Sequence, residues 1–478
     1  MSDDDTSDRS STGVRHRQRT ALVTGASGYI GGRVTERLLG EGWRVRVLAR
    51  SPEKLPDAWR ERVEVAEGDA NSAADLARAL EGVDVAWFLI HSMGGDDDFA
   101  ATDRRIATAF ADAAKKAGVQ RIVYLGGLHP EGEQLSPHLA SRVEVGRILM
   151  DSGVPTAAVQ AGVVLGNGSA SFDMLRTLSE RLPGSVGPRW LQNRIQPIHV
   201  DDIIHYLIRA ADLPREVTRP FDVGGPDVLS YADMMSRYAA IQGLGPRPSI
   251  TAPVWTPRLA SCWISLVTPI AANMARPLVE SLHHDNVVLE RDLDKLVGAP
   301  QGGTIGFDEA VRRETVGVDQ YRFWKLLGAT GAAVAVTAAA SVAATVPATR
   351  WFKSLDKPVW QPPNQVFGPV WTALYADLAF VSAVHLADLL DEERTDEARE
   401  YAAALGVNLV LNGGWSWVFW QLRSMPAATG VAAALAASSA DLVRRVGRHK
   451  ERGFVLAPYA AWAVFATALT AELWRRNR

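Results

Sequence analysis

The sequence predicts an α/β domain with a doubly wound parallel sheet, joined to an all-α bundle of five transmembrane helices. The first part shows strands alternating with helical patterns, beginning with a strand, a glycine-rich turn and a helix at residues 20–39, and this order builds a parallel sheet. The second part shows five apolar stretches after residue 325, of about the length that crosses a bilayer. At 478 residues the chain is also too long for one ordinary domain.

Composition excludes several classes of function. Hydrophobic residues make up 47%, charged residues 22%, and the net charge is -3, so we expect neither a nucleic-acid partner nor a disordered acidic chain. Most of the charged residues lie before residue 326, and those after it gather in short segments between apolar stretches. A single cysteine, Cys262, excludes an intrachain disulfide and a Cys-based zinc site, and we expect no metal.

Three glycines at intervals of three residues, Gly25, Gly28 and Gly31, follow the first strand. In a βαβ unit this spacing lets the backbone turn tightly and approach a pyrophosphate, which would lie at the helix N-terminus. Glycines that only form a turn are the alternative, but a second strand at residues 43–49 follows at the spacing of a βαβ unit. The remaining loop residues that we expect at this dinucleotide site are Ser27, Tyr29 and Ile30.

The residue that ends the second strand reads the adenosine ribose in such a domain, and an acid there binds the 2′-hydroxyl of NAD. Here the strand ends at Arg50 and Ser51. A cation pairs with a 2′-phosphate, so we expect NADP rather than NAD; a solvated loop charge is the alternative. Asp69, which ends the third strand, is a candidate neighbour of the adenine.

Three further strands are predicted at residues 63–66, 83–90 and 121–125, with a helix at 99–117. His91 follows the fourth strand and His129 follows the fifth. Open α/β sheets bind ligands at the carboxyl ends of their strands. Each histidine is therefore a candidate for contact with substrate or nicotinamide, and each is alternatively a loop residue.

The segment Thr24-Gly25-Ala26-Ser27-Gly28-Tyr29-Ile30-Gly31 resembles the TGxxGxxG fingerprint of extended and atypical short-chain dehydrogenase/reductases, and the resemblance extends to about residue 315. It implies a Rossmann fold and a nicotinamide cofactor. Family members that reduce carbonyls use a Ser after the fifth strand and a Tyr-x-x-x-Lys pair in the next helix. Here Gly126 and Gly127 replace the Ser, and His138 and Arg142 replace the pair.

Two interpretations of this replacement stay open. In the first, His138 exchanges the proton and Arg142 holds a ribose. In the second, the domain binds nucleotide without catalysis, as in NmrA-like redox sensors. The Tyr321 to Lys325 motif borders the first membrane helix and is not the catalytic pair.

We expect a disordered polar tail and no secretory signal at the N-terminus, which places the α/β domain in the cytoplasm. The expected divisions are the tail at 1–19, the NAD(P)-binding domain at 20–315 with a substrate lobe at about 155–300, a linker at 316–325 and the membrane domain at 326–478.

The five expected spans are 326–347, 366–388, 401–422, 426–443 and 453–474. With a cytoplasmic first domain, an odd number of spans places the C-terminus outside. The basic segment 444–452 is then cytoplasmic, as the positive-inside rule favours, whereas Arg475, Arg476 and Arg478 oppose it. We therefore expect an integral protein of the cytoplasmic membrane.

Four tryptophan-containing segments lie in order along this half. They begin with Trp351, Phe367, Leu411 and Pro458, and read WFKSLDKPVWQPP, FGPVWTALY, LNGGWS and PYAAWAVFA. Together they resemble the TspO/MBR proteins, also called tryptophan-rich sensory or peripheral benzodiazepine receptor-like proteins, over residues 324–475.

That resemblance implies a pocket between the helices for protoporphyrin or another tetrapyrrole, or for sterol-like or isoprenoid lipids, and often a homodimer. Flat ligands of this kind stack on indoles. An interfacial belt of tryptophans is the alternative, and it suits Trp324, Trp351 and Trp474 at the span ends. The positions that match the family's pocket are Trp360, Pro362, Tyr375, Asn412, Trp415, Trp462 and Phe465.

Three functions are compatible with these observations. The chain is a membrane-bound sensor or binding protein for a tetrapyrrole or redox state, or an NADPH-dependent oxidoreductase acting on a tetrapyrrole, carotenoid or quinone, or two activities that share only a location. The missing Ser and Tyr favour the sensor.

Overall fold

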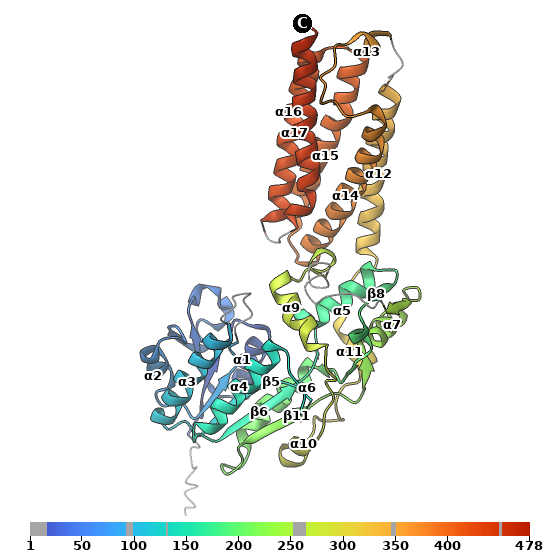
Figure 1. Cartoon of the computed structure of the whole chain (residues 1–478). Helices are drawn as coiled ribbons and strands as arrows, with labels where there is room; N and C mark the ends of the chain where they lie inside the picture. The colour runs from blue at the N-terminus through green and yellow to red at the C-terminus, as the bar shows by residue number, and fades with distance from the viewer. Residues whose placement is uncertain (1–16, 92–98, 131, 252–263, 346–349, 449–451) are drawn as a thin grey trace, which may run out of the picture. The chain divides into compact units, whose positions relative to one another are not determined.

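The computed structural model describes residues 17–91, 99–130, 132–251, 264–345, 350–448 and 452–478 (Figure 1). Cys262 and most of the predicted tail lie outside them. The chain forms two compact units. The first comprises residues up to 169, 193–229 and 281–310, and the second comprises 170–192, 230–280 and 311–478.

The first unit is built on a seven-stranded parallel sheet in the order β11-β6-β5-β4-β1-β2-β3. Its strands are β1 (Thr20–Thr24), β2 (Arg44–Ala49), β3 (Val63–Glu67), β4 (Val85–Phe88), β5 (Arg121–Gly127), β6 (Thr156–Ala161) and β11 (Arg219–Val223). The five predicted strands are confirmed, and the sheet is doubly wound as predicted. Short strands also form, namely β7 (Val164–Leu165), β9 (Arg194–Ile195), β10 (Ile198–His199) and β12 (Leu229–Ser230).

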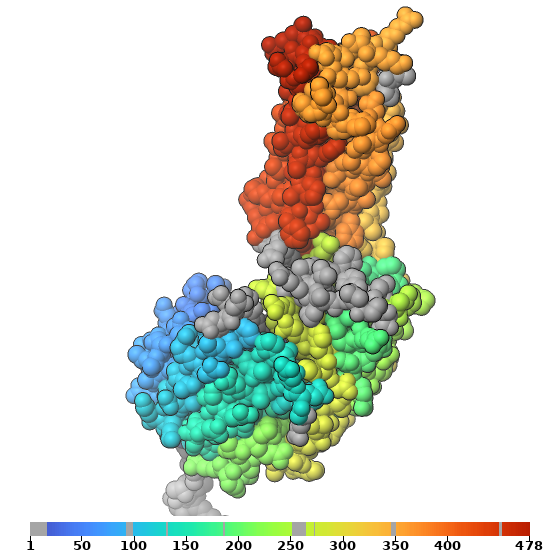
Figure 2. Space-filling model, in the orientation of Figure 1, coloured from blue at the N-terminus to red at the C-terminus, as the bar shows by residue number. Residues whose placement is uncertain are grey.

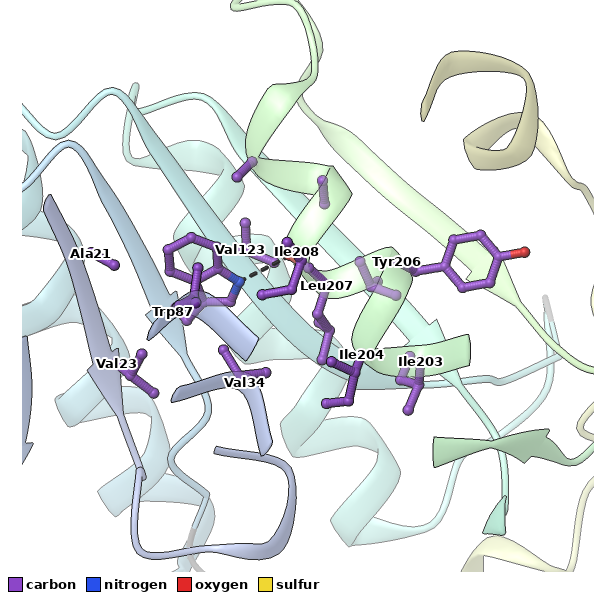
Figure 3. Close-up of a cluster of buried hydrophobic side chains, with 14 of the residues drawn as sticks. Ala21, Val23, Val34, Trp87, Val123, Ile203, Ile204, Tyr206, Leu207 and Ile208 are labelled. Atoms are coloured by element: carbon purple, nitrogen blue, oxygen red, sulfur yellow. Dashed lines mark hydrogen bonds between the residues drawn. The ribbon is translucent and has the colours of Figure 1, made fainter. Parts of the chain in front are cut away.

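Helices cover both faces of this sheet. They are α1 (Tyr29–Gly40), α2 (Ala73–Leu80), α3 (Phe99–Ala117), α4 (Pro137–Asp151), α6 (Val200–Arg209) and α10 (Asp292–Val297). Helix α11 (Phe307–Glu314) contains the residue at which the first unit ends. One buried cluster packs α1 and α6 on one face, and another packs α2, α3 and α4 on the other. In the first cluster, Trp87 of β4 is fully buried and its indole Nε1 donates to the carbonyl of Leu207 in α6 at 2.9 Å (Figure 3).

The sheet has a switch point between β1 and β4, because the chain leaves β1 for β2 on one side and later returns to β4 on the other. The hydroxyl of Thr24 bridges the two strand ends: it donates to the carbonyl of Trp87 at 3.1 Å and accepts from the amide of Leu89 at 3.2 Å. Ligands bind at such a point in doubly wound sheets.

The second unit contains part of the predicted substrate lobe and the membrane domain. Its lobe elements are α5 (Ala170–Arg181), β8 (Ser185–Gly187), α7 (Tyr231–Ile241), β13 (Ser249–Thr251) and α9 (Ala272–Ser281). The bundle contains α12 (Arg322–Ala344), α14 (Asn364–Asp391), α15 (Thr395–Ser416), α16 (Met425–Gly447) and α17 (Gly453–Arg476), with the short helix α13 (Arg350–Ser354) after α12.

Four helices of the described chain are long and apolar enough to cross a membrane, namely α12, α14, α16 and α17. The third predicted span, 401–422, is not confirmed, although its residues do form α15 and a following π-helical turn at Trp417–Gln421. The reason is that α15 begins earlier than predicted and includes the charged residues Asp396, Glu397, Arg399 and Glu400. The first span also begins earlier, at Arg322, inside the predicted linker.

Candidate functional site

The glycine loop lies at the switch point and depends on close backbone contacts. Gly25 has a φ of +74°, and a Cβ there would lie 2.7 Å from the carbonyl oxygen of Leu89. A Cβ on Gly31 would clash with the carbonyl oxygen of Gly25. Side chains at these two positions are therefore excluded by neighbouring backbone.

Helix α1 begins at Tyr29, and no side chain caps its first turn. Its first backbone N–H groups have no partner within the helix, and such an end favours an anion. Ser27 and Gly28 are exposed beside it. The ring of Tyr29 lies against Arg33 and the loop at Gly168, and Ile30 packs against the core, so both offer backbone N–H groups to a ligand.

The predicted adenosine contacts follow the ends of β2 and β3, which are neighbouring strands. Arg50 is exposed and Ser51 is half-buried. The carboxylate of Asp69 accepts from the backbone and side-chain amides of Asn71, at 2.9 and 3.0 Å. The backbone N–H of Asn71 lowers the pKa of Asp69, and the Arg50 cation adds to the effect. Arg50 and Asp69 therefore lie near each other, and the Asp69 carboxylate also stabilises a local turn; their contact with a cofactor stays a prediction.

The ends of β4 and β5 bring His91, His138 and Arg142 together. The imidazole rings of His91 and His138 lie 6.5 Å apart, and His91 and Arg142 line one small cavity. His138 and Arg142 lie one turn apart on α4, whose N-terminus Ser136 caps. Burial, and then the Arg142 cation, lowers the pKa of His138 to about 4. At neutral pH the ring of His138 is therefore an uncharged donor and acceptor.

Arg142 carries a buried Nε–H that finds no acceptor in the described part of the chain. A buried donor without a partner is costly and is rare in native structures. His129 lies nearby in sequence, and its Nδ1 is 3.1 Å from the carbonyl oxygen of Gly127, so the backbone holds its ring.

Sequence reasoning missed Tyr124 of β5, which is buried behind the histidines. Its hydroxyl donates to the carbonyl of Arg142 at 3.0 Å, and burial raises the pKa of the phenol to about 12. Glycines make room for this ring, since a Cβ on Gly126 or Gly146 would approach it to 3.3 Å. Tyr124 thus fixes α4 against the sheet. The only signal in the sequence is a tyrosine beside glycines, which is weak.

In the bundle, polar side chains form a hydrogen-bonded chain between helices. The hydroxyl of Tyr375 donates to Asn412 at 2.6 Å, the amide of Asn412 donates to Tyr459 at 3.3 Å, and Tyr459 donates to Asn408 at 2.6 Å. The predicted residues Tyr375 and Asn412 are therefore in direct contact. Tyr459 and Asn408 were not predicted as site residues.

The predicted aromatic residues lie partly together. Ring centroids of Trp462 and Phe465 are 5.0 Å apart, and those of Trp360 and Phe465 are 5.9 Å apart. Trp415 instead stacks on Phe419 at 5.1 Å. Pro362 is half-buried in the segment before α14. The indole Nε1 groups of Trp415 and Trp462 are buried without a hydrogen-bond acceptor among the described residues.

Comparisons with known proteins divide the chain in two. A model of the TspO/MBR family matches residues 329–475, and a model described as NAD(P)H-binding matches residues 25–161. The translocator protein of Ovis aries is 32% identical over 138 residues, which cover 27% of this chain and 76% of the relative.

Two reductases resemble the first part. The (4-alkanoyl-5-oxo-2,5-dihydrofuran-3-yl)methyl phosphate reductase of Streptomyces griseus is 30% identical over 230 residues, covering 46% of this chain and 73% of the relative. The ceramide reductase of Caulobacter vibrioides is 29% identical over 233 residues, covering 47% of this chain and 71% of the relative.

The glycine loop makes a specific prediction for nicotinamide binding. Gly31→Ala places a methyl group against the Gly25 carbonyl, and overpacking of about 1–3 kcal/mol corresponds to an NADPH affinity weakened roughly 5- to 150-fold. Titration of NADPH fluorescence measures it. Gly40→Ala, in the same helix, meets no atom within 4 Å and serves as the control; equal affinities for both variants contradict the assignment of the loop.

Proposed function

Because the chain belongs to the TspO/MBR family through residues 329–475 and to the NAD(P)H-binding family through residues 25–161, we propose that it is a membrane-bound, NADP(H)-dependent reductase of a hydrophobic substrate. The observation that carries this proposal is the group His91, His138 and Arg142 at the strand ends that adjoin the glycine loop. The reductase relatives support hydride chemistry in this half.

The residues of the first unit fit a nicotinamide dinucleotide. The N-terminus of α1 would hold the pyrophosphate, and Arg50 with Ser51 would hold the 2′-phosphate of NADP. The unpartnered Nε–H of Arg142 suits a ribose hydroxyl as its acceptor. When bound, NADPH supplies a hydride.

His138 takes the place of the usual tyrosine. Its lowered pKa keeps the ring neutral at physiological pH, and a neutral imidazole donates a hydrogen bond to a substrate oxygen, which polarises a carbonyl. Tyr124 does not substitute for the missing phenol, because its hydroxyl is already bonded to the Arg142 carbonyl. His138 would therefore polarise the carbonyl as a hydrogen-bond donor, and the proton that the reduced oxygen takes up would come from water.

The bundle would bind a tetrapyrrole or a sterol-like or isoprenoid lipid. Its aromatic residues offer flat apolar contacts, and the unpartnered Nε1 groups of Trp415 and Trp462 offer donors to polar groups of the ligand. A hydrophobic compound held there would be either the substrate or a signal.

The second candidate function is a sensor that binds nucleotide and ligand without turnover. The specific observation in its favour is that Gly126 and Gly127 leave no side-chain hydroxyl where related reductases polarise the carbonyl. We also propose that the bundle forms a homodimer.

We place the first unit in the cytoplasm and the bundle in the cytoplasmic membrane. Arg444 and Arg445 lie in the last turn of α16 and Arg448 directly follows it, and this basic segment favours the cytoplasmic side. Arg475 and Arg476 at the end of α17 oppose this orientation.

Arg50 decides the choice of cofactor. Removal of its charge in Arg50→Ala eliminates a charge-assisted contact of about 1.5–3 kcal/mol, so NADPH affinity should fall roughly 10- to 150-fold while NADH affinity stays nearly constant. Equilibrium titrations with both nucleotides measure the two effects. Arg60→Ala, at an exposed position nearby, should change neither; equal losses for NADPH and NADH contradict the assignment of the 2′-phosphate to Arg50.

His138 distinguishes the reductase from the sensor. Purified full-length protein with NADPH and a panel of carbonyl, quinone and polyene substrates should show nucleotide oxidation, and His138→Ala should lower kcat about 100-fold or more without a comparable loss of NADPH affinity. His205→Ala, on α6, is the control. Absence of turnover across the panel, with intact NADPH binding, supports the sensor instead.

Trp462 tests the ligand site of the bundle. Protoporphyrin IX should quench tryptophan fluorescence with saturation, and Trp462→Ala should weaken its affinity roughly 30-fold, as expected for a central aromatic contact worth about 2 kcal/mol. Trp417→Ala removes an exposed indole of the same bundle and controls for lost signal. Unsaturable quenching, or the same change in both variants, would exclude porphyrin at this site.

A further inference from the structure

The lobe and the bundle of the second unit meet at a buried ionic cluster centred on Asp388 of α14. Arg181, the last residue of α5, donates through Nη2 to Asp388 Oδ1 at 2.7 Å, and Arg452 contacts Asp388 Oδ2. The side chains of Asp388, Arg181 and Arg452 are 2%, 3% and 3% exposed. One carboxylate thus joins a lobe helix to two membrane helices, because Arg452 directly precedes α17.

Further polar contacts extend the ionic cluster. Arg176 of α5 approaches Asp391 at 3.5 Å, and Arg322 at the start of α12 also contacts Asp391. Trp324 donates to the carbonyl of Glu180 at 2.8 Å, which connects the start of α12 to α5. Helices α12, α14 and α17 are therefore all connected to α5 or to its partner Asp388.

The two arginines that bind Asp388 also donate to backbone carbonyl oxygens. Arg181 donates to Val267 at 2.8 Å and Arg452 donates to Ser265 at 2.8 Å. These contacts use directed guanidinium N–H groups, whose geometry tolerates little displacement.

Such a cluster is poorly explained by stability alone. A buried ion pair is often no more stabilising than apolar residues of the same volume, whereas removal of one partner leaves an uncompensated charge. What directed ion pairs add is a defined geometry. A shift of α14 against α17 would break the Arg452–Asp388 pair, and a shift of α14 against α5 would break the Arg181–Asp388 pair.

The same two helices meet again at the candidate ligand site. Tyr375 lies on α14 about 20 Å before Asp388, at a rise of about 1.5 Å per residue, and Tyr459 and Trp462 lie on α17 beyond Arg452. Tyr375 and Tyr459 are linked there through Asn412. A ligand that separates the aromatic ends of α14 and α17 therefore acts on helices whose other ends share Asp388.

We propose that Asp388 is a positioning residue through which ligand occupancy of the bundle sets the position of lobe helix α5. The identity of the ligand rests on the proposed function, but the mechanical link rests on the ionic cluster. The effect is reciprocal, so a lobe held in one position also changes the affinity of the bundle for its ligand.

Hydrogen exchange of full-length protein in detergent, read on peptides from residues 170–181, tests the proposal with protoporphyrin IX as the probe. In the wild-type protein, saturating probe should change the exchange rates of α5 at least 3-fold. Arg181→Met should weaken that response, because it removes the α5 cation that binds Asp388 and leaves Arg452 paired with Asp388, so the bundle still folds and binds the probe. Asp396→Asn, in an exposed pair with Arg399, should respond like the wild type.

A response of α5 in Arg181→Met equal to that of the wild type overturns the proposal, as does no response in wild-type protein that demonstrably binds the probe. If the wild type binds no protoporphyrin IX, the proposed ligand is wrong and the link is judged without probe: Asp388→Asn and Arg181→Met should then raise α5 exchange at least 10-fold over Asp396→Asn. Unchanged α5 exchange in both variants overturns the proposal in that case also.

Discussion

The nucleotide site depends on the contact between Gly25 and the backbone of Leu89. This contact brings the end of β1 against the end of β4 across the switch point, and Thr24 bonds to both sides of the same junction. Any side chain at Gly25 would separate the two strands. Because the strands meet there, the loop that receives a pyrophosphate and the segment that carries His91 become neighbours.

The position of each other candidate site residue depends on which strand carries it and on which side of that junction the strand lies. The ends of β2 and β3 carry Arg50 and Asp69 on one side of β1, and the ends of β4 and β5 carry the histidines on the other. This arrangement separates the adenosine contacts from the reacting end of a dinucleotide. In the proposed reductase the reacting end would differ from that of a tyrosine-dependent enzyme, because His138 is a neutral imidazole at physiological pH, whereas a tyrosine needs its pKa lowered by a neighbouring cation.

What the sequence predicted well is local. The glycine turn and the strands depend on residues within a few turns of one another, and these elements are confirmed in the fold. His138 and Arg142 also lie one turn apart on one helix, while their role stays a prediction. The failures concern contacts between distant segments. The hydroxyl of Tyr124 donates to the backbone carbonyl of Arg142, eighteen residues away. Nothing in the types of these two residues predicts the contact.

The span count shows a second limit. Hydropathy treats each helix by itself, whereas α15 combines a charged first turn with Asn408 and Asn412, whose polar groups are satisfied by Tyr459 and Tyr375 on neighbouring helices. A helix whose polar residues bond to its neighbours need not be apolar all round. The sequence therefore predicted a helix here correctly, but its ability to span a membrane is not confirmed.

The sequence did not predict the ionic cluster either. Arg181 and Asp388 are 207 residues apart, and they belong to segments predicted to lie in different domains. Its physical meaning concerns the junction itself. An anchor that only holds an enzyme at a membrane needs a linker, and burying Asp388, Arg181 and Arg452 adds a desolvation cost that a flexible linker avoids. Directed, buried ion pairs between α5 and the bundle are instead what a protein needs if movement of the bundle is to displace α5. The fused bundle is therefore better understood as a part of the substrate lobe than as its tether.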